Sequence, residues 1–492
     1  MGVIVKQATY STIFSYVGAL LGFLNVTILM NRWFTTEELG LREIILNIAV
    51  IFAQLACLGT TNSLVKFFPF FNRTSNKDNG LLTIGAFISL VGFLVFGIIL
   101  FIFKGVLIEK FNAKSVLFEE YFWTLFPLAL LLLYNQLLEN YIKARSRTAL
   151  TTFLKEVFHR VIVVILLILF YYKTIDYYEF IIYFILSYSV TIFLYIAHLY
   201  YNKELYLKVD FKYFPARFRK IYFNYSLYSI LSGFSNLLIA KIDIIMIGFV
   251  LGLTSTAIYA NAVYLSVLIF IPALAMTKIA SPIIAKEFKF KRIKEIEILY
   301  KKSSTTQFLV GGIIFILMWS SIDNFYEIQR EEYRQGKFVL FLLGSSRVIS
   351  MLFGLAGPII HISKYYRFDT VTSISLAVLT VITNYVAIPL YGIEGAAFAT
   401  MTSLSLFYFI RYLFVKNKIG IQPFTRDTAV VAIILICAFL IGKFLPKISN
   451  IYFDTIYRSV IVSLFAVFFT IYMKVSEEIN RLFRKSIKKA GF

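Results

Sequence analysis

Stretches of about 20 mainly apolar residues recur along the whole chain, and they restrict its fold more than any other feature. A stretch of that length crosses a bilayer as an α-helix, because a helix satisfies its backbone hydrogen bonds internally where water is absent. This criterion predicts fourteen membrane spans. Their centres lie near residues 19, 54, 92, 132, 163, 189, 238, 270, 312, 349, 380, 403, 435 and 463.

The composition supports a membrane protein. Of 492 residues, 59% are hydrophobic and 15% are charged, whereas a soluble domain carries roughly a quarter charged residues. Cys57 and Cys437 lie far apart in apolar stretches, which excludes a disulfide framework and a zinc site. The sequence therefore predicts an all-α integral membrane protein with no metal centre.

The net charge of +22 is explained by topology. With the N-terminus in the cytoplasm, 33 of the 49 Lys and Arg residues fall in inward segments and 12 in outward segments. Cytoplasmic loops carry an excess of basic residues, so both termini are expected inside the cell. The basic charge is therefore no sign of a nucleic-acid partner.

A faint internal repeat divides the chain. The span that begins "YSTIFSYVGALLGF" and the span that begins "YSILSGFSNLLIA" are both followed by a few polar residues and a second span. We expect two pseudo-symmetric six-helix lobes plus a terminal helix pair, with a site at the lobe interface. The predicted parts are an N-lobe 1–200, a basic linker 201–221, a C-lobe 222–418, a helix pair 419–474 and a basic tail 475–492.

One inward segment, "KEFKFKRIKEIEILYKK", mixes basic and apolar residues. Phe290, Ile293, Ile296 and Tyr300 recur at three- and four-residue spacing, which gives one apolar stripe among lysines. This pattern predicts a helix that lies on the inner leaflet and is held by anionic lipid. The alternative is a docking site for a cytoplasmic partner.

Four segments resemble the polysaccharide-exporting branch of the multidrug/oligosaccharidyl-lipid/polysaccharide (MOP) superfamily. They are "ILNIAVIFAQLACLGTTNSLVKFFP", "LKEVFHRVIVVILL", "DIIMIGFVLGLTSTAIYANA" and "ITNYVAIPLYGIEGAAFAT". The likeness runs from the N-terminus to about residue 415, and the order and spacing of the segments are more specific than any single one.

The resemblance implies a flippase with two lobes around a central cavity in the bacterial inner membrane. It implies that an undecaprenyl-pyrophosphate-linked glycan crosses by alternating access, with membrane lipids and polymer-assembly membrane proteins as partners. It implies neither an enzyme nor a cofactor, and Na⁺ or H⁺ stays open as a coupling ion. It does not identify the glycan.

A polar stripe in the second span offers a surface for sugars. Glu43, Asn47, Gln54 and Thr61 are separated by four, seven and seven residues, which places them on one face of a continuous helix. We expect Asn47, Gln54 and Thr61 to line the cavity. The alternative is hydrogen bonding between helices within the lobe.

Asn25 shares a face of the first span with Gly18 and Gly22. The spacing of the two glycines is typical of closely packed helices. Asn25 is still a candidate for the cavity lining, because packing and cavity faces adjoin.

Lys241, Asp243 and Arg347 are charged residues within predicted spans, where each carries an insertion cost of about 2.5 to 3.5 kcal/mol. Lys241 and Arg347 are candidates for binding the pyrophosphate, since the planar guanidinium fork suits a phosphate. Asp243 is a candidate for an ion pair or a coupling cation. The alternative is structural pairing, Asp243 with Arg347 or Glu43 with Lys241.

A further charged group lies near the predicted inner face, with Glu139 and Lys143 in the fourth span and Glu156, His159 and Arg160 in the fifth. Opposite charges on consecutive antiparallel helices predict ion pairs that hold a lobe together. His159 is the member whose charge could switch near neutral pH, so proton coupling is a second hypothesis.

Two other functions stay open. A cation-coupled exporter of small amphipathic compounds would need acids and aromatics in its site, whereas Lys241 and Arg347 favour an anionic cargo. A polyprenyl-dependent glycosyltransferase or polymerase would need paired acids on an outward loop, for which "DNFYEIQREEYRQ" is the acidic candidate.

Overall fold

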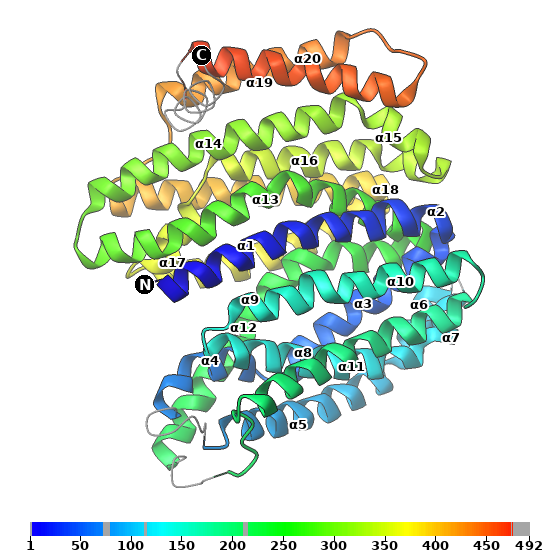
Figure 1. Cartoon of the computed structure of the whole chain (residues 1–492), viewed down its shortest axis with the longest axis vertical. Helices are drawn as coiled ribbons and strands as arrows, with labels where there is room; N and C mark the ends of the chain where they lie inside the picture. Colours follow the sequence, from blue (N-terminus) through cyan, green and yellow to red (C-terminus); the bar gives the residue numbers. More distant parts are fainter. Residues whose placement is uncertain (1, 72–78, 113–115, 210–214, 474, 476–492) are drawn as a thin grey trace. The chain divides into compact units, whose positions relative to one another are not determined.

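The computed structural model describes residues 2–71, 79–112, 116–209, 215–473 and 475, and every regular element in these ranges is helical (Figure 1). The all-α class is therefore confirmed. The predicted basic tail lies outside the described residues apart from Val475, as does part of the predicted linker.

The chain up to the middle of the sequence forms α1 to α12. Their bounds are α1 Gly2–Phe23, α2 Asn31–Trp33, α3 Thr36–Ala56, α4 Thr60–Phe71, α5 Leu81–Ile102, α6 Lys104–Asn112, α7 Leu117–Tyr121, α8 Leu125–Ala144, α9 Thr148–Thr152, α10 His159–Tyr171, α11 Tyr177–Tyr201 and α12 Ala216–Leu251. Two π-helical segments, Leu24–Met30 and Phe153–Phe158, continue α1 and α9.

The remainder of the described chain forms α13 to α20. Their bounds are α13 Leu253–Lys289, α14 Ile293–Ser320, α15 Ile322–Ile328, α16 Lys337–Leu352, α17 Ala356–Ile362, α18 Tyr366–Ile419, α19 Arg426–Phe444 and α20 Ile451–Tyr472. Short 3₁₀ turns at Phe122–Thr124 and Glu331–Gly336 precede α8 and α16.

Eleven helices of the described chain are long and apolar enough to cross a membrane, or twelve if the bent pair Glu331–Leu352 and Ala356–Ile362 is one span. The predicted count of fourteen is not confirmed. At 1.5 Å per residue, however, the 54 residues of α18 would measure about 80 Å, far more than the bilayer core of about 30 Å. Gly392 breaks α18 with a non-helical conformation, so this helix has the length of two spans.

Side-chain caps at several helix starts explain why the helices begin where they do. Thr35 accepts from the amide of Glu38, and the Glu38 carboxylate accepts from the amide of Thr35. Asp176 and Glu179 form the same reciprocal pair at the start of α11. Such capping boxes satisfy amides that have no partner within the first turn of the helix.

The described chain divides into two compact units, Met1–Ala260 and Asn261–Phe492, so the division falls inside α13. Helix α12 packs on α3 and α4 of the first unit. The predicted lobe boundaries come from a sequence repeat, whereas the two units are defined by packing. The lobe boundaries therefore stay a prediction.

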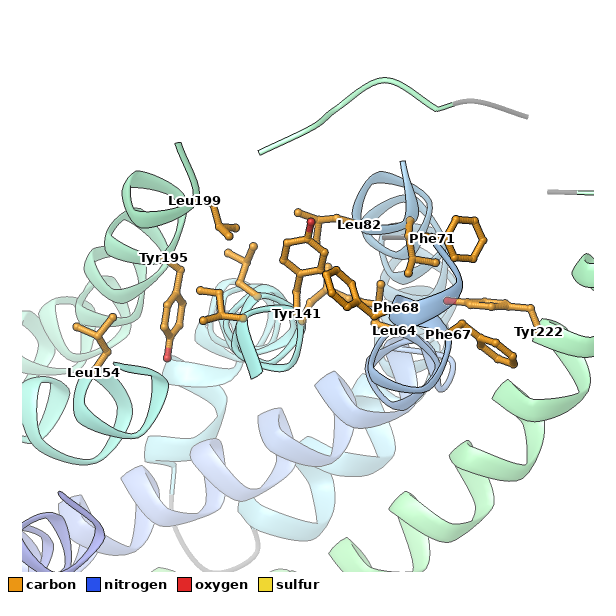
Figure 2. Packing of buried hydrophobic residues seen from close by; sticks show 14 residues of the cluster. Leu64, Phe67, Phe68, Phe71, Leu82, Tyr141, Leu154, Tyr195, Leu199 and Tyr222 are labelled. Atoms are coloured by element: carbon orange, nitrogen blue, oxygen red, sulfur yellow. The ribbon is translucent and has the colours of Figure 1, made fainter. Parts of the chain in front are cut away.

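The first unit has an aromatic core between α4, α8, α11 and α12 (Figure 2). Phe67 of α4 lies against Tyr222 of α12 with ring centroids 5.7 Å apart, and Phe68 meets Tyr141 of α8 edge-on at 5.6 Å. Hydrogen bonds between Asn62 and Ser229 and between Ser63 and Ser226 extend this contact, at 2.7 and 2.8 Å. The first half of α12 is therefore fixed to α4.

The helix predicted on the inner leaflet is not a separate element, because its residues from Ile293 onward are the first turns of α14, and its contact with lipid stays a prediction. Ile296 and Tyr300 belong to α14 and are 1% and 0% exposed, packed in the second unit against Ala280, Ile284 and Leu355. The part of the stripe within α14 faces this core, whereas Phe290 lies in the short turn between α13 and α14 and is 54% exposed.

Helices α19 and α20 pack on α14 in the second unit, and Figure 1 shows the three lying alongside one another. Val431, Leu435 and Ala438 of α19 meet Leu309 of α14 and Val462 of α20 in a second core cluster. The terminal helix pair therefore belongs to the body of the second unit.

Candidate functional site

The polar stripe of the second span lies inside the first unit. Asn47 donates from Nδ2 to the Glu43 carbonyl oxygen at 2.7 Å and to Glu43 Oε2 at 3.5 Å. Gln54 Oε1 accepts from Gln136 Nε2 of α8 at 2.9 Å. Asn47 and Gln54 therefore form hydrogen bonds within the first unit. Their role in lining a cavity stays a prediction.

Thr61 does not share a helix with the rest of the stripe. Helix α3 ends at Ala56, and α4 begins after Leu58 and Gly59, which both have positive φ angles of 46° and 73°. A Cβ at Gly59 would lie 2.2 Å from the carbonyl oxygen of Ser226, so this break allows α12 to approach closely. The expectation of one continuous helical face through Thr61 is wrong for this reason.

Glu43 forms an ion pair with Arg42, its neighbour in the sequence. Both side chains are buried, with 1% and 7% of the residue exposed, and the Arg42 guanidinium lies 4.9 Å from the ring centroid of Phe184. Arg42 is not among the candidate residues predicted from the sequence. The signal was present, since "GLREIIL" carries a cation beside an acid at the start of a span.

Lys241 of α12 joins this cluster. It interacts electrostatically with Glu43 and Arg42, while part of its own surface stays exposed. Within the described residues, no carboxylate oxygen lies close enough to form an ion pair with its ammonium group. A direct structural pair between Glu43 and Lys241, the alternative left open by the sequence, is therefore not formed.

Asp243 faces a different neighbour. Its Oδ2 accepts a hydrogen bond from Tyr259 Oη at 2.9 Å, and the side chain is buried. Residues two apart on a helix point to nearly opposite faces, which explains why Lys241 and Asp243 have separate surroundings. A role for Asp243 as an ion pair or coupling group stays a prediction.

Asn25 lies in the π-helical segment that follows α1, and it donates from Nδ2 to the Arg160 carbonyl at 2.9 Å. Arg160 in turn donates to the Gly18 carbonyl and to Glu156 Oε2, the latter at 2.7 Å. A Cβ at Gly18 would lie 2.7 Å from the Glu156 carbonyl oxygen, so the glycine permits close packing. These residues join α1 to α10, and a cavity role for Asn25 stays a prediction.

His159 is buried between two helices of the first unit. Its Nε2 lies 3.0 Å from Ser187 Oγ, and its ring lies 4.2 Å from that of Tyr188. The Ser187 hydroxyl already donates to the Phe184 carbonyl, so Nε2 carries the hydrogen and donates to Ser187. The geometry places a hydrogen on Nε2, and proton coupling through His159 stays a prediction.

Glu139 joins α8 to the π-helical segment after α9. Its carboxylate accepts from Lys143 at 2.5 Å within α8 and from Lys155 at 3.1 Å across the helix boundary. Glu139 is buried, whereas both lysines keep contact with the surface. The structure therefore shows an ion pair between α8 and the segment Phe153–Phe158 at this position.

Arg347 belongs to α16 in the second unit. Its guanidinium carbon lies 5.4 Å from the ring centroid of Phe270 on α13, in the geometry of a cation–π contact. Lys241 belongs to the first unit, so joint binding of one anion by Lys241 and Arg347 stays a prediction.

The cluster that can act on a ligand is thus Arg42, Glu43 and Lys241. Two cations and one carboxylate give a net positive charge among apolar helices, where burying an unneeded charge is costly. An anion is the partner that lowers this cost. Such an arrangement can bind an anionic group, and it contains no nucleophile placed beside a general base.

The comparisons with known proteins agree with this fold. The model of a family described as polysaccharide biosynthesis proteins matches residues 4–288. Comparison with curated proteins gives no significant match.

Solved structures with the same fold include two kinds of transporter. A lipid II flippase, MurJ, in an inward closed conformation has a TM-score of 0.75 at 15% identity, covering 94% of this chain and 98% of the other. An inward-facing multidrug resistance MATE family transporter of the MOP superfamily has a TM-score of 0.66 at 14% identity, covering 85% and 98%. The chain therefore belongs to the polysaccharide biosynthesis protein family and has the fold that MurJ and the MATE transporters share.

Proposed function

We propose that the protein is a flippase that moves a polyprenyl-pyrophosphate-linked oligosaccharide across the bacterial inner membrane for cell-surface polysaccharide synthesis. The movement follows alternating access, in which the site opens first to one side of the membrane and then to the other. Neither a cofactor nor a covalent step is needed, because the cargo leaves chemically unchanged. Na⁺ or H⁺ can supply the energy.

The observation that carries this proposal is the cluster of Arg42, Glu43 and Lys241 among membrane-spanning helices. A pyrophosphate carries the negative charge that Lys241 and Arg42 attract, and Arg42 offers the planar fork that binds two phosphate oxygens. The family match supports a glycan as the rest of the cargo. Arg347 of the second unit is proposed as a further phosphate contact.

The MurJ structure supports a lipid-linked cargo, since that protein is described as a lipid II flippase. The two sequences are 15% identical, so the residues that determine the glycan and lipid specificity differ between the two proteins in this proposal. Membrane lipids and polymer-assembly membrane proteins are the proposed partners.

A gene deletion tests the proposal. Cells that lack the protein should make lipid-linked repeat units but fail to display the finished polymer, and the precursor should accumulate on the cytoplasmic side. Unchanged surface glycan in a strain without a second flippase would remove the proposal. Complementation by the intact gene is the control.

Reporter fusions test the proposed orientation. Fusions at Arg217 and Lys289 should report a cytoplasmic location, and one at Glu331 should report the outside. A cytoplasmic signal at Glu331 would contradict the charge-based topology and the placement of both termini inside the cell.

The MATE structures support a second candidate, an exporter of small amphipathic compounds. This function predicts that the deletion strain becomes sensitive to cationic drugs while its surface polymer is normal. The cationic cluster of Arg42 and Lys241 weighs against it, because the cluster would repel such cargo.

The acidic outward segment gives little support to an enzyme. Asp323 accepts from Lys337 at 2.6 Å and Glu327 accepts from Lys447 at 2.8 Å. Two of the acids that a glycosyl-transfer site would use are therefore engaged in ion pairs. We propose transport without catalysis.

A further inference from the structure

Glu43 is the carboxylate of the cationic cluster in the first unit. It pairs with Arg42 and interacts electrostatically with Lys241. Glu43 and Arg42 are buried, whereas Lys241 is partly exposed. Arg42 and Lys241, which a phosphate would bind, therefore already interact with a carboxylate of the protein itself.

We infer that Glu43 is a resident competitor, a carboxylate that offsets part of the charge of Arg42 and Lys241 while no cargo is bound and gives them up when a cargo anion arrives. This inference rests on the proposed function and adds a regulatory residue to the same site. In this inference Glu43 competes with cargo for Arg42 and Lys241, which is a different role from a structural ion pair between helices.

Without cargo, the two cations of the site still need an anion nearby. Two neighbouring cations without an anion repel each other, and the buried Arg42 also loses hydration, so the resident carboxylate stabilises the empty transporter. The same carboxylate weakens cargo binding, because its pair with Arg42 must be broken or shared first. A site of this kind releases cargo readily, since Glu43 can take back its partners.

The displaced carboxylate must itself be accommodated. An ionised carboxylate left alone in an apolar interior is costly, so Glu43 takes up one proton from water when the cargo anion replaces it. Asn47, whose Nδ2 lies 3.5 Å from Glu43 Oε2, can stay bonded to the neutral acid. Cargo binding is then linked to proton uptake.

The groups around Glu43 fit this assignment. Lys241 of α12 interacts with it electrostatically, as do Tyr177 and Tyr188 of α11. On the other side of Arg42, His159 of α10 lies within electrostatic reach of the guanidinium. None of these four neighbours is a second carboxylate that could replace Glu43.

Binding of inorganic pyrophosphate to the purified full-length protein in detergent tests the inference. Glu43→Gln keeps the size of the side chain and removes the competitor, so its affinity should rise about tenfold as more of the site becomes available. The affinity of the wild type should fall more steeply with rising pH than that of the variant, because its binding consumes a proton. The difference in slope should be up to about tenfold in affinity per pH unit, which corresponds to one proton.

A matched control is Glu156→Gln, which neutralises another intramembrane carboxylate of the first unit that pairs with an arginine. This variant should bind pyrophosphate with the affinity and pH dependence of the wild type. Pyrophosphate itself titrates in this range, and comparing variants removes that contribution.

The outcomes separate the two levels of the proposal. Equal affinity and equal pH dependence in wild type and Glu43→Gln would overturn the competitor role and leave the anion site in place. No binding of pyrophosphate to either folded protein would remove the anion site and the proposed function together.

If Glu43→Gln does not fold, the wild type alone still decides. Sulfate keeps two charges throughout the neutral range, and calorimetry in buffers of different ionisation enthalpy measures the protons taken up when it binds. Uptake approaching one proton per sulfate supports the competitor role. Sulfate binding without proton uptake overturns it.

Discussion

Two charged clusters in the membrane-spanning helices differ in how much of their hydrogen-bonding capacity the protein itself uses. In the second unit, Arg458 of α20 donates to Asp454 Oδ2 at 2.7 Å and to the carbonyls of Gly442, Leu445 and Pro446 at 3.0, 2.9 and 3.2 Å. These carbonyls lie at and beyond the end of α19, where they lack helical partners. The guanidinium joins α19 to α20.

The cluster of the first unit is built differently. Arg42 and Glu43 form a buried pair, but the ammonium group of Lys241 makes no hydrogen bond or ion pair with the residues that the structure describes. A buried charge that the protein fully satisfies is structural, whereas one with unused donors is ready for a ligand. The contrast between Arg458 and Lys241 therefore carries the functional argument.

The largest expected effect is on stability at α20. Arg458→Met leaves the buried Asp454 without its cation, which should cost about 3 to 5 kcal/mol, so the protein level should collapse. Quantitative blotting of membranes and thermal unfolding in detergent measure this loss. Adding Asp454→Asn should restore much of the protein level. A normal level of Arg458→Met alone would contradict the structural role of Arg458 and remove its contrast with Lys241.

The second effect is on transport and spares stability. Lys241→Met keeps bulk and lowers the insertion cost, so the protein level should hold or rise while flipping falls about tenfold or more, a factor of ten for each 1.4 kcal/mol of lost cargo binding. Lys241→Arg should retain part of the activity because it keeps the charge. Accumulation of the lipid-linked precursor measures both variants, and equal activity of the two would contradict a role for charge.

A smaller effect is expected at Glu139. Glu139→Gln leaves Lys143 and Lys155 without their acid, but both lysines reach the surface and can be hydrated. The loss should be about 1 kcal/mol, seen as a modest fall in unfolding temperature with unchanged flipping. A collapse of the protein level similar to that of Arg458→Met would show that surface access does not rescue a broken pair.

The smallest effect is expected for Lys447→Gln. Lys447 pairs with Glu327 at 2.8 Å on an exposed surface, where water replaces the lost partner. Protein level and transport should both match the wild type. A measurable defect in either would mean that this segment has a role beyond its ion pair.

The sequence predicts the class of the fold and several of the buried polar residues, because both follow from hydropathy. A charge within an apolar stretch needs a partner or a ligand, which is sufficient to select Glu43, Lys241 and Glu139. An ion pair from Glu139 to the following helical segment follows from the same argument, although its cation is Lys155, while the predicted Arg160 pairs with Glu156.

Other features depend on local geometry that hydropathy does not encode. The break at Gly59, where the backbone of Ser226 approaches closely, separates Thr61 from α3. Ile296 and Tyr300 have the pattern of a surface helix, yet the turn before α14 directs them into a core. The choice of Arg42 over Lys241 as the partner of Glu43 depends on side-chain positions in the packed unit.

The most direct test of the central claim is surface-polymer display in cells that carry Lys241→Met alone or together with Glu43→Gln. If Lys241 binds cargo, the double variant should be present in the membrane and should still fail to display polymer, because the cation is missing. If Lys241 instead balances Glu43 for structural reasons, removing the acid should compensate for the missing cation. Polymer display by the double variant at the level of the wild type would contradict the proposed role of Lys241.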